Sequence, residues 1–546
     1  MTREGTQTRG EPLILAFDVG TTAMKTCLYS MGKQFRLEVS ARAEYSLSIL
    51  ENGGAEQDPE EWFEAIVKTC REIFIGGEFS PESISGISFC SQMQGLVLVD
   101  RNGKALRPSM SYMDGRGREQ KRAACYIPGT KIRGPAIEGI PPFKLLNSIA
   151  HTGIAPTSVK DPIWRYQWVR ENEPEVFAHI YKWLDVKEYL IMKLTGRAVM
   201  TPDSACATFL YDNRPGRNCW SRSLCRQYRI DHSHMPEMIA GEDEAGPLQA
   251  GVAKILGLPG GIPVFGGGGD ASLIGLGSGC VDDKDGHIYL GTSAWVSSLT
   301  SKRILDLKYM IGSITCSIPD RYNYFCEQET GGKCMEWVCN HLAQDEIGIY
   351  LEKKEISADP DSIYKNLFEY LNEVVSKTRP GCGGLLFTPW LHGSRSPFED
   401  PNARGMFFNI GLNTGKSEMV RAVVEGLAYN LKWMLSSLER KCIPGERIRF
   451  VGGGALSKVT GQILADITGR TLEVPENPQN SGALGAAVIG GIGLGKIESF
   501  RDIPSRIPIE YVYYPTDAHK EVYDRNYRVF RDLYRSNRRS FSILNN

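Results

Sequence analysis

An apolar segment that ends in a carboxylate and a hydroxyl-rich turn opens the chain. Leu13–Phe17 precedes Asp18, and Val19-Gly20-Thr21-Thr22 follows. Glycine lets a backbone approach a phosphate closely, and amides and threonine hydroxyls donate to its oxygens. A carboxylate beside such a turn can hold Mg²⁺ through water. The stretch therefore suits a polyphosphate and its metal, and the alternative is a plain β-hairpin with turn-forming residues.

A second carboxylate follows a run of glycines. The short apolar segment 262–265 leads into Gly266–Gly269, then Asp270, then the small-residue segment 271–279, which we expect to be a helix. Two interpretations remain open. Asp270 is only the N-cap of that helix, or the glycines clear space for a substrate and leave one carboxylate facing it.

The opening pattern recurs in the second half of the chain. When Gly20 is aligned with Gly291, GTTAMKTCL matches GTSAWVSSL, and each copy follows an apolar segment. Ser293 replaces Thr22, and Tyr289 stands where the first copy has Asp18, so the carboxylate is not duplicated. One explanation of the match is chance. The other is that the chain has two similar halves, each with a hydroxyl-rich turn, and that the two turns bind phosphates from both sides.

Three further clusters follow predicted strands or turns. Ser91–Gly95 follows the predicted strand 84–90, at a position where α/β proteins place ligand contacts. In Tyr112–Arg116, Asp114 and Arg116 form either a local surface ion pair or a hydrogen-bonding set for a polyol. Gly452–Gly454 follows the predicted strand 447–451 and forms either a backbone cradle for a flat or anionic ligand or a tight strand-to-helix turn.

Alternating and helical apolar patterns predict the elements that position these residues. Asp58, Pro59 and Glu61 form a helix start with a capping pattern. We expect helices over 59–75, 361–378, 416–439 and 460–468, and a buried small-residue helix over 481–495 that packs closely against a sheet. That last run is too short and too rich in glycine for a membrane span.

Composition limits the classes of protein. The chain has 546 residues, 42% hydrophobic and 23% charged, with a net charge of -1, which predicts two domains and argues against nucleic acid or an anionic membrane as partner. The 14 cysteines are scattered without CxxC spacing, which favours reduced thiols in the cytoplasm. The polar N-terminus has no hydrophobic signal segment and is expected to be a disordered tail.

These motifs, in this order, resemble the FGGY carbohydrate kinases, and within that family the chain is most similar to the xylulokinases. The resemblance runs from about residue 12 to residue 500 and is carried by the segments DVGTTAMK, SQMQGLVLVD, SYMDGR, GGGGDASLIGLGSG, LGTSAWV, GSRSPFEDPNARG and VGGGALSKVTGQILADITG. It implies an α/β fold of two ribonuclease-H-like domains, as in actin and Hsp70, around a central cleft. We place residues 1–11 in the tail, 12–275 in an N-terminal domain on the sugar side, and 276–546 in a C-terminal domain on the nucleotide side.

The resemblance also implies roles for single residues. Asp270 matches the general base that takes the proton from the sugar hydroxyl, and Asp18 matches the acid associated with Mg²⁺. Nucleotide contacts are expected at Thr21, Thr22, Lys25, Gly291, Thr292, Gly332, Gly453, Gly454 and Lys458. Sugar contacts are expected at Met93, Gln94, Asp114 and Asp270.

Departures from the xylulokinase pattern lie on the sugar side. Gln94 stands where those enzymes have His, Tyr112-Met113 where they have Trp-Asn, and Ala271 where they have Asn. The expected activity is ATP- and Mg²⁺-dependent phosphorylation of a ketopentose such as D-xylulose. The alternatives are a kinase for another pentulose, a tetritol or a gluconate-like acid, and a non-catalytic ATP-binding regulator of the same superfamily. The expected partner is a small sugar or polyol, and a homodimer is an open alternative to a monomer.

Overall fold

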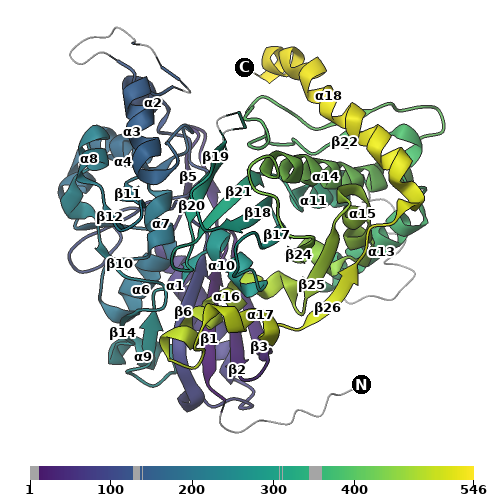
Figure 1. The fold of residues 1–546 in the computed structure, drawn as a ribbon. Coiled ribbons are helices and arrows are strands. Elements are labelled where there is room, and N and C mark those ends of the chain that lie inside the picture. Colours follow the sequence, from purple (N-terminus) through teal and green to yellow (C-terminus); the bar gives the residue numbers. More distant parts are fainter. Residues whose placement is uncertain are drawn as a thin grey trace.

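The computed structural model describes residues 11–126, 134, 136–137, 139–306, 308–309, 311–342 and 360–545. It contains two large mixed sheets, one from each half of the chain, with helices packed on their faces (Figure 1). The expected tail, residues 1–11, lies outside the described residues apart from Glu11.

The first sheet is built from the N-terminal half. Its seven strands follow the order β14 (Glu244–Pro247), β15 (Pro263–Phe265), β6 (Ile84–Ser91), β1 (Leu13–Val19), β2 (Ala23–Met31) and β3 (Phe35–Glu44), and β16 (Gly268–Gly269) pairs with β6 off this path. β1 runs antiparallel to β2 and parallel to β6.

The second sheet is built from the C-terminal half. Its eight strands follow the order β19 (Leu305–Asp306), β20 (Ile311–Thr315), β21 (Tyr322–Gln328), β18 (Ala294–Thr300), β17 (Gly286–Leu290), β24 (Arg447–Val451), β25 (Thr471–Pro475) and β26 (Ile509–Tyr513). β17 runs antiparallel to β18 and parallel to β24.

The two sheets share one central topology. In each, a hairpin continues into a third antiparallel strand on one side and meets parallel strands on the other: β3-β2-β1-β6-β15 in the first sheet and β21-β18-β17-β24-β25 in the second. The matched hairpins, β1–β2 and β17–β18, are those that carry the sequence repeat. The predicted similarity of the two halves is therefore confirmed at the level of strand order and direction.

A long helical segment separates β6 from β15. It contains α2 (Arg118–Ala123), α3 (Pro142–Thr152), α4 (Pro162–Asn172), α5 (Pro174–Ala178), α6 (Val186–Thr195), α7 (Pro202–Ala207), α8 (Arg222–Gln227) and α9 (Ala250–Leu256). It also contains the short strands β7 (Val97–Val99), β8 (Ser109–Met110), β9 (Lys182–Leu184), β10 (Val199–Met200), β11 (Tyr211–Asp212), β12 (Cys219–Trp220) and β13 (Glu237–Met238). Trp164 and Trp183 are buried in its core and pack against other apolar side chains.

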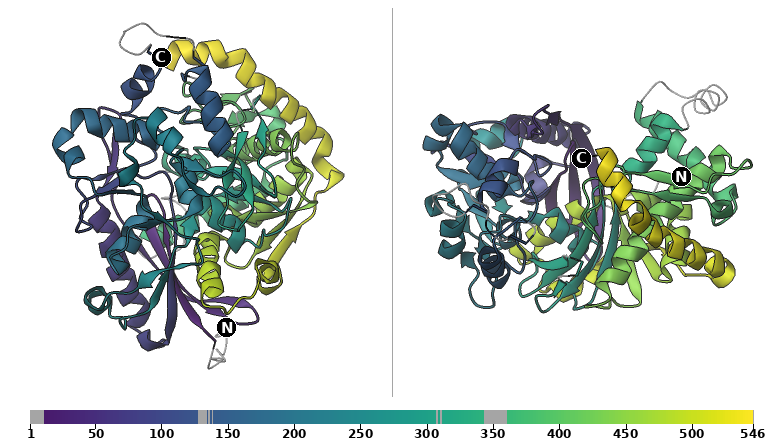
Figure 2. Two further views of the ribbon diagram at one scale, coloured as in Figure 1. Left: turned by 60° about the vertical axis from the view of Figure 1, so that its left-hand side comes forward. Right: turned by 90° about the horizontal axis from the view of Figure 1, so that it is seen from above.

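The remaining elements complete the two halves. Before β6 the chain forms β4 (Ser48–Ile49), β5 (Ala55–Gln57) and α1 (Pro59–Phe74). The second half adds α11 (Lys333–His341), α13 (Pro360–Lys377), β22 (Leu386–Thr388), β23 (Met406–Phe408), α14 (Lys416–Leu438), α15 (Lys458–Thr468), α16 (Ser481–Gly493), α17 (Ile503–Arg506) and the C-terminal α18 (Lys520–Asn545). In both views of Figure 2, α18 lies along the outside of the C-terminal half.

Two small-residue helices hold the halves together. α10 (Asp270–Gly277) follows β16, and α16 packs against α10 and against β1, β2 and β6 of the first sheet. A Cβ at Gly277 would lie 1.9 Å from the Ser481 carbonyl oxygen, and one at Gly485 would lie 2.1 Å from that of Leu273. The glycines therefore allow direct backbone contact between α10 and α16, and the predicted buried helix over 481–495 is confirmed.

Helix starts are only partly predicted by residue type. Asp58 caps α1 and accepts a hydrogen bond from the Glu60 amide at 2.9 Å. Glu61, expected to close the capping pattern, instead accepts hydrogen bonds from the amide and hydroxyl of Ser46. The carboxylate therefore ties α1 to the chain before β4, because a better-placed donor competes with the helix terminus.

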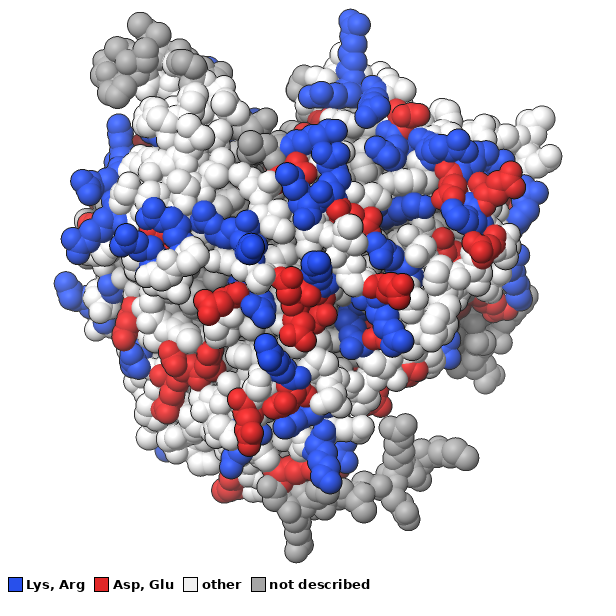
Figure 3. All heavy atoms as spheres, viewed as in Figure 1, with Lys and Arg blue, Asp and Glu red and all other residues white. Residues whose placement is uncertain are grey.

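On the face drawn in Figure 3, acidic and basic side chains are interspersed rather than separated into areas of one charge. Among the described residues, no helix has the length and apolar character needed to cross a membrane. All 14 cysteines are free, and all except Cys219 are buried.

Candidate active site

The candidate site begins where three strands of the first sheet end side by side. Asp18 of β1 pairs in register with Cys90 of β6, and Cys90 pairs with Gly268 of β16. Because all three strands are parallel, Asp18 and the Gly268–Asp270 segment come to the same edge of the sheet. Two carboxylates far apart in sequence thus belong to one site.

Asp18 is a half-buried carboxylate. The Cys90 thiol donates to it, and the N-terminal turn of α16 lies against it, since a Cβ at Gly482 would be 3.1 Å from Asp18 Oδ2. Burial raises the pKa of Asp18, while the charge of Lys25 and the hydrogen bond from Cys90 lower it. The partial positive charge of a helix N-terminus also favours the ionised form.

Asp270 is the first residue of α10, and the N-cap is Gly269. The interpretation of Asp270 as the N-cap is therefore wrong, although its Oδ1 does accept a hydrogen bond from the Ala271 amide at 2.8 Å. Burial, together with the charges of Asp18, Glu327 and Asp185, raises the pKa of Asp270 to about 7, although the hydrogen bond from the Ala271 amide acts in the opposite direction. A carboxylate with a pKa near 7 suits a general base at neutral pH.

One interpretation of the sequence was that the glycines before Asp270 clear open space for a substrate. The structure shows that they do not. They are buried and let the backbone pass close to neighbours on every side. An added Cβ would lie 2.0 Å from the Phe89 carbonyl oxygen at Gly267, 2.4 Å from Ser317 Oγ at Gly268, and 2.4 Å from Met93 Sδ at Gly269. Met93 thus packs directly against the residue that precedes Asp270.

The two repeated hairpin turns have the same length but are closed by hydrogen bonds to carbonyl oxygens at different positions. Gly20–Thr22 joins β1 to β2, and the Gly20 amide donates to the Ala23 carbonyl oxygen at 3.0 Å. Gly291–Ser293 joins β17 to β18, and the Gly291 amide donates to the Ser293 carbonyl oxygen, also at 3.0 Å. Thr22 and Thr292 are the exposed residues of the two turns.

Tyr289 places the second hairpin near the first. It stacks on Trp295 with ring centroids 3.9 Å apart. Burial raises the pKa of Tyr289, and the charges of Asp18 and Asp270 raise it further. Tyr289, which stands where the first hairpin has Asp18, therefore lies close enough to Asp18 and Asp270 for their charges to affect its pKa.

Other expected nucleotide contacts line the same two turns. Gly332 donates to the Gly291 carbonyl oxygen at 2.6 Å, so the start of α11 is tied to the second turn. Lys25 Nζ donates to the Gln479 carbonyl oxygen at 2.6 Å, next to the N-terminus of α16. Thr21 Oγ1 lies 3.3 Å from the Tyr112 hydroxyl, which links the first turn to the SYMDGR segment.

The expected adenosine segment lies between β24 and α15. A Cβ at Gly453 would meet nothing within 4 Å, whereas one at Gly454 would lie 2.5 Å from Leu290 Cδ2. Lys458, the first residue of α15, places its ammonium 4.5 Å from the centre of the Tyr511 ring. Gly453 thus borders open space, and Gly454 packs against the strand that leads into the second turn.

The segment around Gln94 is held by buried charged side chains. Gln94 has a φ of 64°, and its amide donates to Asp185 Oδ2 at 2.8 Å. Arg165, fully buried, donates to the carbonyl oxygens of Gln94, Met110 and Ser111. Arg165 therefore fixes two expected sugar-side segments relative to one another.

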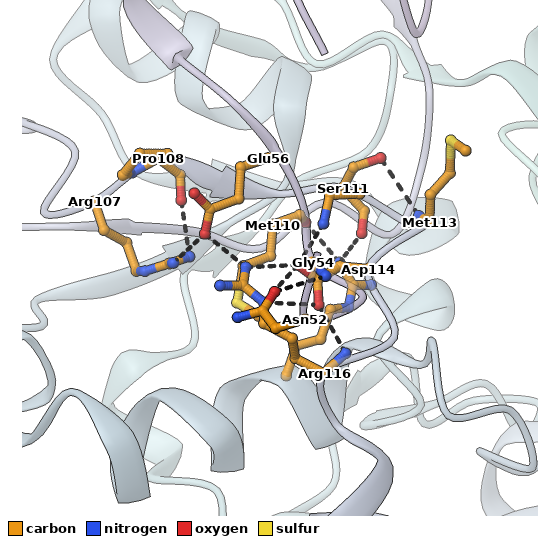
Figure 4. Close-up of polar contacts among 12 residues, drawn as sticks. Asn52, Gly54, Glu56, Arg107, Pro108, Met110, Ser111, Met113, Asp114 and Arg116 are labelled. Atoms are coloured by element: carbon orange, nitrogen blue, oxygen red, sulfur yellow. Dashed lines mark hydrogen bonds and ion pairs between the residues drawn. The ribbon is translucent and has the colours of Figure 1, made fainter. Parts of the chain in front are cut away.

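Asp114 is engaged within the protein. Its carboxylate accepts from the Ala55 amide at 2.9 Å and from the Arg116 guanidinium at 2.6 Å, and Arg116 also binds Glu56 (Figure 4). The Asp114 and Arg116 side chains are 0% and 5% exposed. The ion pair exists, but the expectation of a surface pair is wrong, since β5 and α4 cover it. A sugar contact by Asp114 stays a prediction.

The donor set fits Mg²⁺ bound mainly through phosphates. Among the described residues, no group of three or more His, Cys, Asp or Glu side chains gathers to hold a metal. Asp18 and Asp270 are two half-buried carboxylates whose charges interact, which suits a hard cation held by one or two carboxylates plus substrate oxygens. Asp18 would hold the ion, and the ion would neutralise phosphate charge.

Several residues of the site were not predicted. Tyr112, Arg165, Asp185, Asp203 and Glu327 carry contacts or charges that act on the expected residues. They lie in five separate parts of the chain, and the only sequence signal was the position of Tyr112 inside the SYMDGR segment.

Family models match most of the chain. The model described as "FGGY family of carbohydrate kinases, N-terminal domain" matches residues 13–125 and 145–277, and that of the C-terminal domain matches residues 286–494. The chain is 28% identical over 529 residues to the xylulose kinase of Staphylococcus epidermidis, which covers 96% of each. It is 28% identical over 526 residues to the gluconokinase of Bacillus subtilis, covering 96% of this chain and 95% of that one.

A solved structure extends the likeness to the fold. The ligand-bound xylulose kinase from Lactobacillus acidophilus superposes with a TM-score of 0.82 at 23% identity and covers 98% of this chain and 100% of that one. The fold is therefore the expected two-domain α/β fold of the actin, Hsp70 and sugar kinase type.

Proposed function

The chain belongs to the FGGY family of carbohydrate kinases, and we propose that it transfers the γ-phosphoryl group of ATP to a hydroxyl of a ketopentose such as D-xylulose, with Asp270 as the general base. It is an ATP-dependent sugar kinase. The observation that carries the proposal is the placement of Asp270, with a pKa of about 7, at the same sheet edge as Asp18.

Asp270 would accept the proton of the sugar hydroxyl as that oxygen attacks phosphorus. Phosphoryl transfer needs mainly positioning, charge neutralisation and one base beside the acceptor oxygen. Met93 packs against Gly269 and so limits where the sugar approaches Asp270. The Gln94 side chain makes no hydrogen bond to another described residue, which leaves its amide for the sugar.

The two hairpin turns would hold the polyphosphate. Thr22 and Thr292, the exposed residues of the two turns, would supply hydroxyl donors. Mg²⁺ held by Asp18 would neutralise charge on the phosphates when bound. Gly453, with open space beside its Cα, would border the adenosine.

A neutral acceptor is supported by the pairing of the nearby cations. Arg116 is bound to Asp114 and Glu56, and Arg165 is bound to three carbonyl oxygens. A sugar acid would need a cation for its carboxylate, because burying an unpaired charge is costly. Neither guanidinium could bind the carboxylate of a sugar acid without breaking its existing hydrogen bonds.

The similarity to the Bacillus subtilis gluconokinase makes a gluconate-like acid the second candidate acceptor. A panel with D-xylulose, other pentuloses, tetritols and D-gluconate, with ADP release coupled to NADH oxidation, separates the candidates. We expect kcat/KM for a ketopentose to exceed that for gluconate by at least tenfold. A preference for gluconate would overturn the ketopentose assignment, and no stimulation by any acceptor would overturn the proposed reaction.

We place this reaction in the cytoplasm. The free, buried cysteines support that compartment, because a reducing environment keeps thiols unpaired. We also keep the proposed boundary between the sugar-side and nucleotide-side domains at residues 275 and 276, which lies near the end of α10.

A further inference from the structure

Asp203 joins the two halves of the molecule at the backbone before Asp270. It lies in α7 and is 1% exposed. Its Oδ2 accepts from the Gly269 amide at 2.7 Å and from Ser317 Oγ at 2.9 Å. Ser317 belongs to the C-terminal half, in the connection between β20 and β21. One carboxylate oxygen therefore binds both the N-cap of α10 and the opposite half.

The orientation of Asp203 is fixed from behind. Its Oδ1 accepts from the Ser204 amide at 2.9 Å and from Thr201 Oγ1 at 2.5 Å. Thr201 Oγ1 in turn accepts from Lys187 Nζ at 2.7 Å. Because an ammonium only donates, the Thr201 hydroxyl must give its proton to Asp203. The carboxylate is thus held as an acceptor, and its Oδ2 cannot turn away without leaving donors unpaired.

Gly268 shows how tightly this contact fits. A Cβ there would lie 2.4 Å from Ser317 Oγ and 2.9 Å from Asp203 Oδ2. The glycine next to the bound amide is therefore needed for Ser317 and Asp203 to meet. On the other side Met93 presses on Gly269, so the backbone that leads into Asp270 is clamped from both faces.

We propose that Asp203 is a positioning residue that couples the contact between the two halves, through Ser317, to the placement of Asp270. This inference rests on the proposed role of Asp270 as the base. When Ser317 donates to Asp203, the Gly269 amide and the start of α10 are held in register with Met93. Without that bond the base loses alignment with the acceptor hydroxyl, and catalysis is sensitive to displacements of this size.

The test compares two cross-half hydrogen bonds on neighbouring residues. Ser317→Ala removes the bond to Asp203. Thr315→Val removes the 3.3 Å bond from Asn213 Nδ2 to Thr315 Oγ1 and the hydrogen bond between Thr315 Oγ1 and the Cys206 thiol, neither of which contacts the Gly269 segment. We expect Ser317→Ala to lower kcat about tenfold with little change in KM for ATP. Ser317→Thr, which keeps the hydroxyl, should restore kcat, and Thr315→Val should leave it within about twofold.

A second readout does not depend on activity. Hydrogen exchange measured on the peptide that spans residues 266–275 should become faster in Ser317→Ala and stay unchanged in Thr315→Val. Equal effects of the two substitutions on kcat, or unchanged exchange in Ser317→Ala, would overturn the coupling. If the wild-type protein shows no sugar-dependent ADP release, the proposed reaction fails, while the exchange result still decides whether Ser317 holds this segment.

Discussion

Asp18 and Asp270 approach one another because their strands end in register: Asp18 pairs with Cys90, and Cys90 pairs with Gly268, two residues before Asp270. The charge of Asp18 adds to burial in raising the pKa of Asp270. One carboxylate thus tunes the basicity of the other, and a cation bound at Asp18 would lower the pKa of Asp270.

The activity should depend on pH through Asp270. Its pKa is about 7 and only the deprotonated carboxylate accepts a proton, so kcat/KM for the sugar should rise as pH increases from 6 to 8. Below that pKa, kcat/KM should fall about tenfold per pH unit. Initial rates between pH 5.5 and 8.5 check this, and a flat profile across that range would contradict it.

Stability should depend on the same group with the opposite sign. A carboxyl whose pKa is raised in the folded state binds its proton more tightly there, so wild-type stability should fall as pH rises from about 4 to about 7. Asp270→Asn removes that loss. We expect the free energy of unfolding of Asp270→Asn to exceed that of wild type by on the order of 1–3 kcal/mol at pH 8.

That stability difference should vanish near pH 4, where the folded wild-type carboxyl is protonated. Denaturant unfolding of both proteins at pH 4.5 and pH 8 measures it. An equal difference at both pH values would mean that the substitution acts through packing.

The buried pair of Asp114 and Arg116 should matter for stability. Asp114→Ala leaves a guanidinium that is 5% exposed without one of its two carboxylate partners, so we expect a loss of about 3 kcal/mol and a higher KM for the sugar. Asp212→Ala is the matched control, because Asp212 pairs with Arg214 at the same spacing while that arginine is 40% exposed. It should cost less than about 1 kcal/mol. Equal losses would contradict the structural role given to Asp114.

Gly453 offers a direct probe of the nucleotide side. Gly453→Ala adds a methyl group into open space, so the fold should keep its melting temperature. If adenosine occupies that space, KM for ATP should rise several-fold while KM for the sugar stays constant. Gly251→Ala, at an exposed position of α9 with nothing within 4 Å of the new Cβ, is the control that should change neither KM.

The sequence predicted those parts of the fold that depend on local patterns. The two hairpins follow from apolar runs that end at Gly20 and Gly291, and α16 follows from its run of small residues. The correspondence between the two hairpins can be predicted only because the short sequence repeat aligns their turns. The strand order of each sheet depends on non-local pairing, which no local pattern encodes.

The sequence predicted the main residues of the candidate site but not the residues that hold them in place. The glycine run singles out Asp270, and the family resemblance implies its role as base, but the reason for the glycines lies in Phe89, Met93 and Ser317, which are far away in sequence. One of the two interpretations of Asp114 placed it in a surface ion pair, because nothing in SYMDGR reveals that it is covered. Asp203 carries no motif, so only its hydrogen bonds assign it a role.

The central claim is best tested by sugar-dependent ADP release of Asp270→Asn beside wild type, at pH 8 with ATP and Mg²⁺ saturating. Asparagine keeps the size of the side chain and cannot accept the proton of the hydroxyl. We expect wild type to release ADP only when a ketopentose is present, and Asp270→Asn to lose at least about a thousandfold in kcat while ATP still raises its melting temperature. Wild-type turnover by Asp270→Asn would contradict the account.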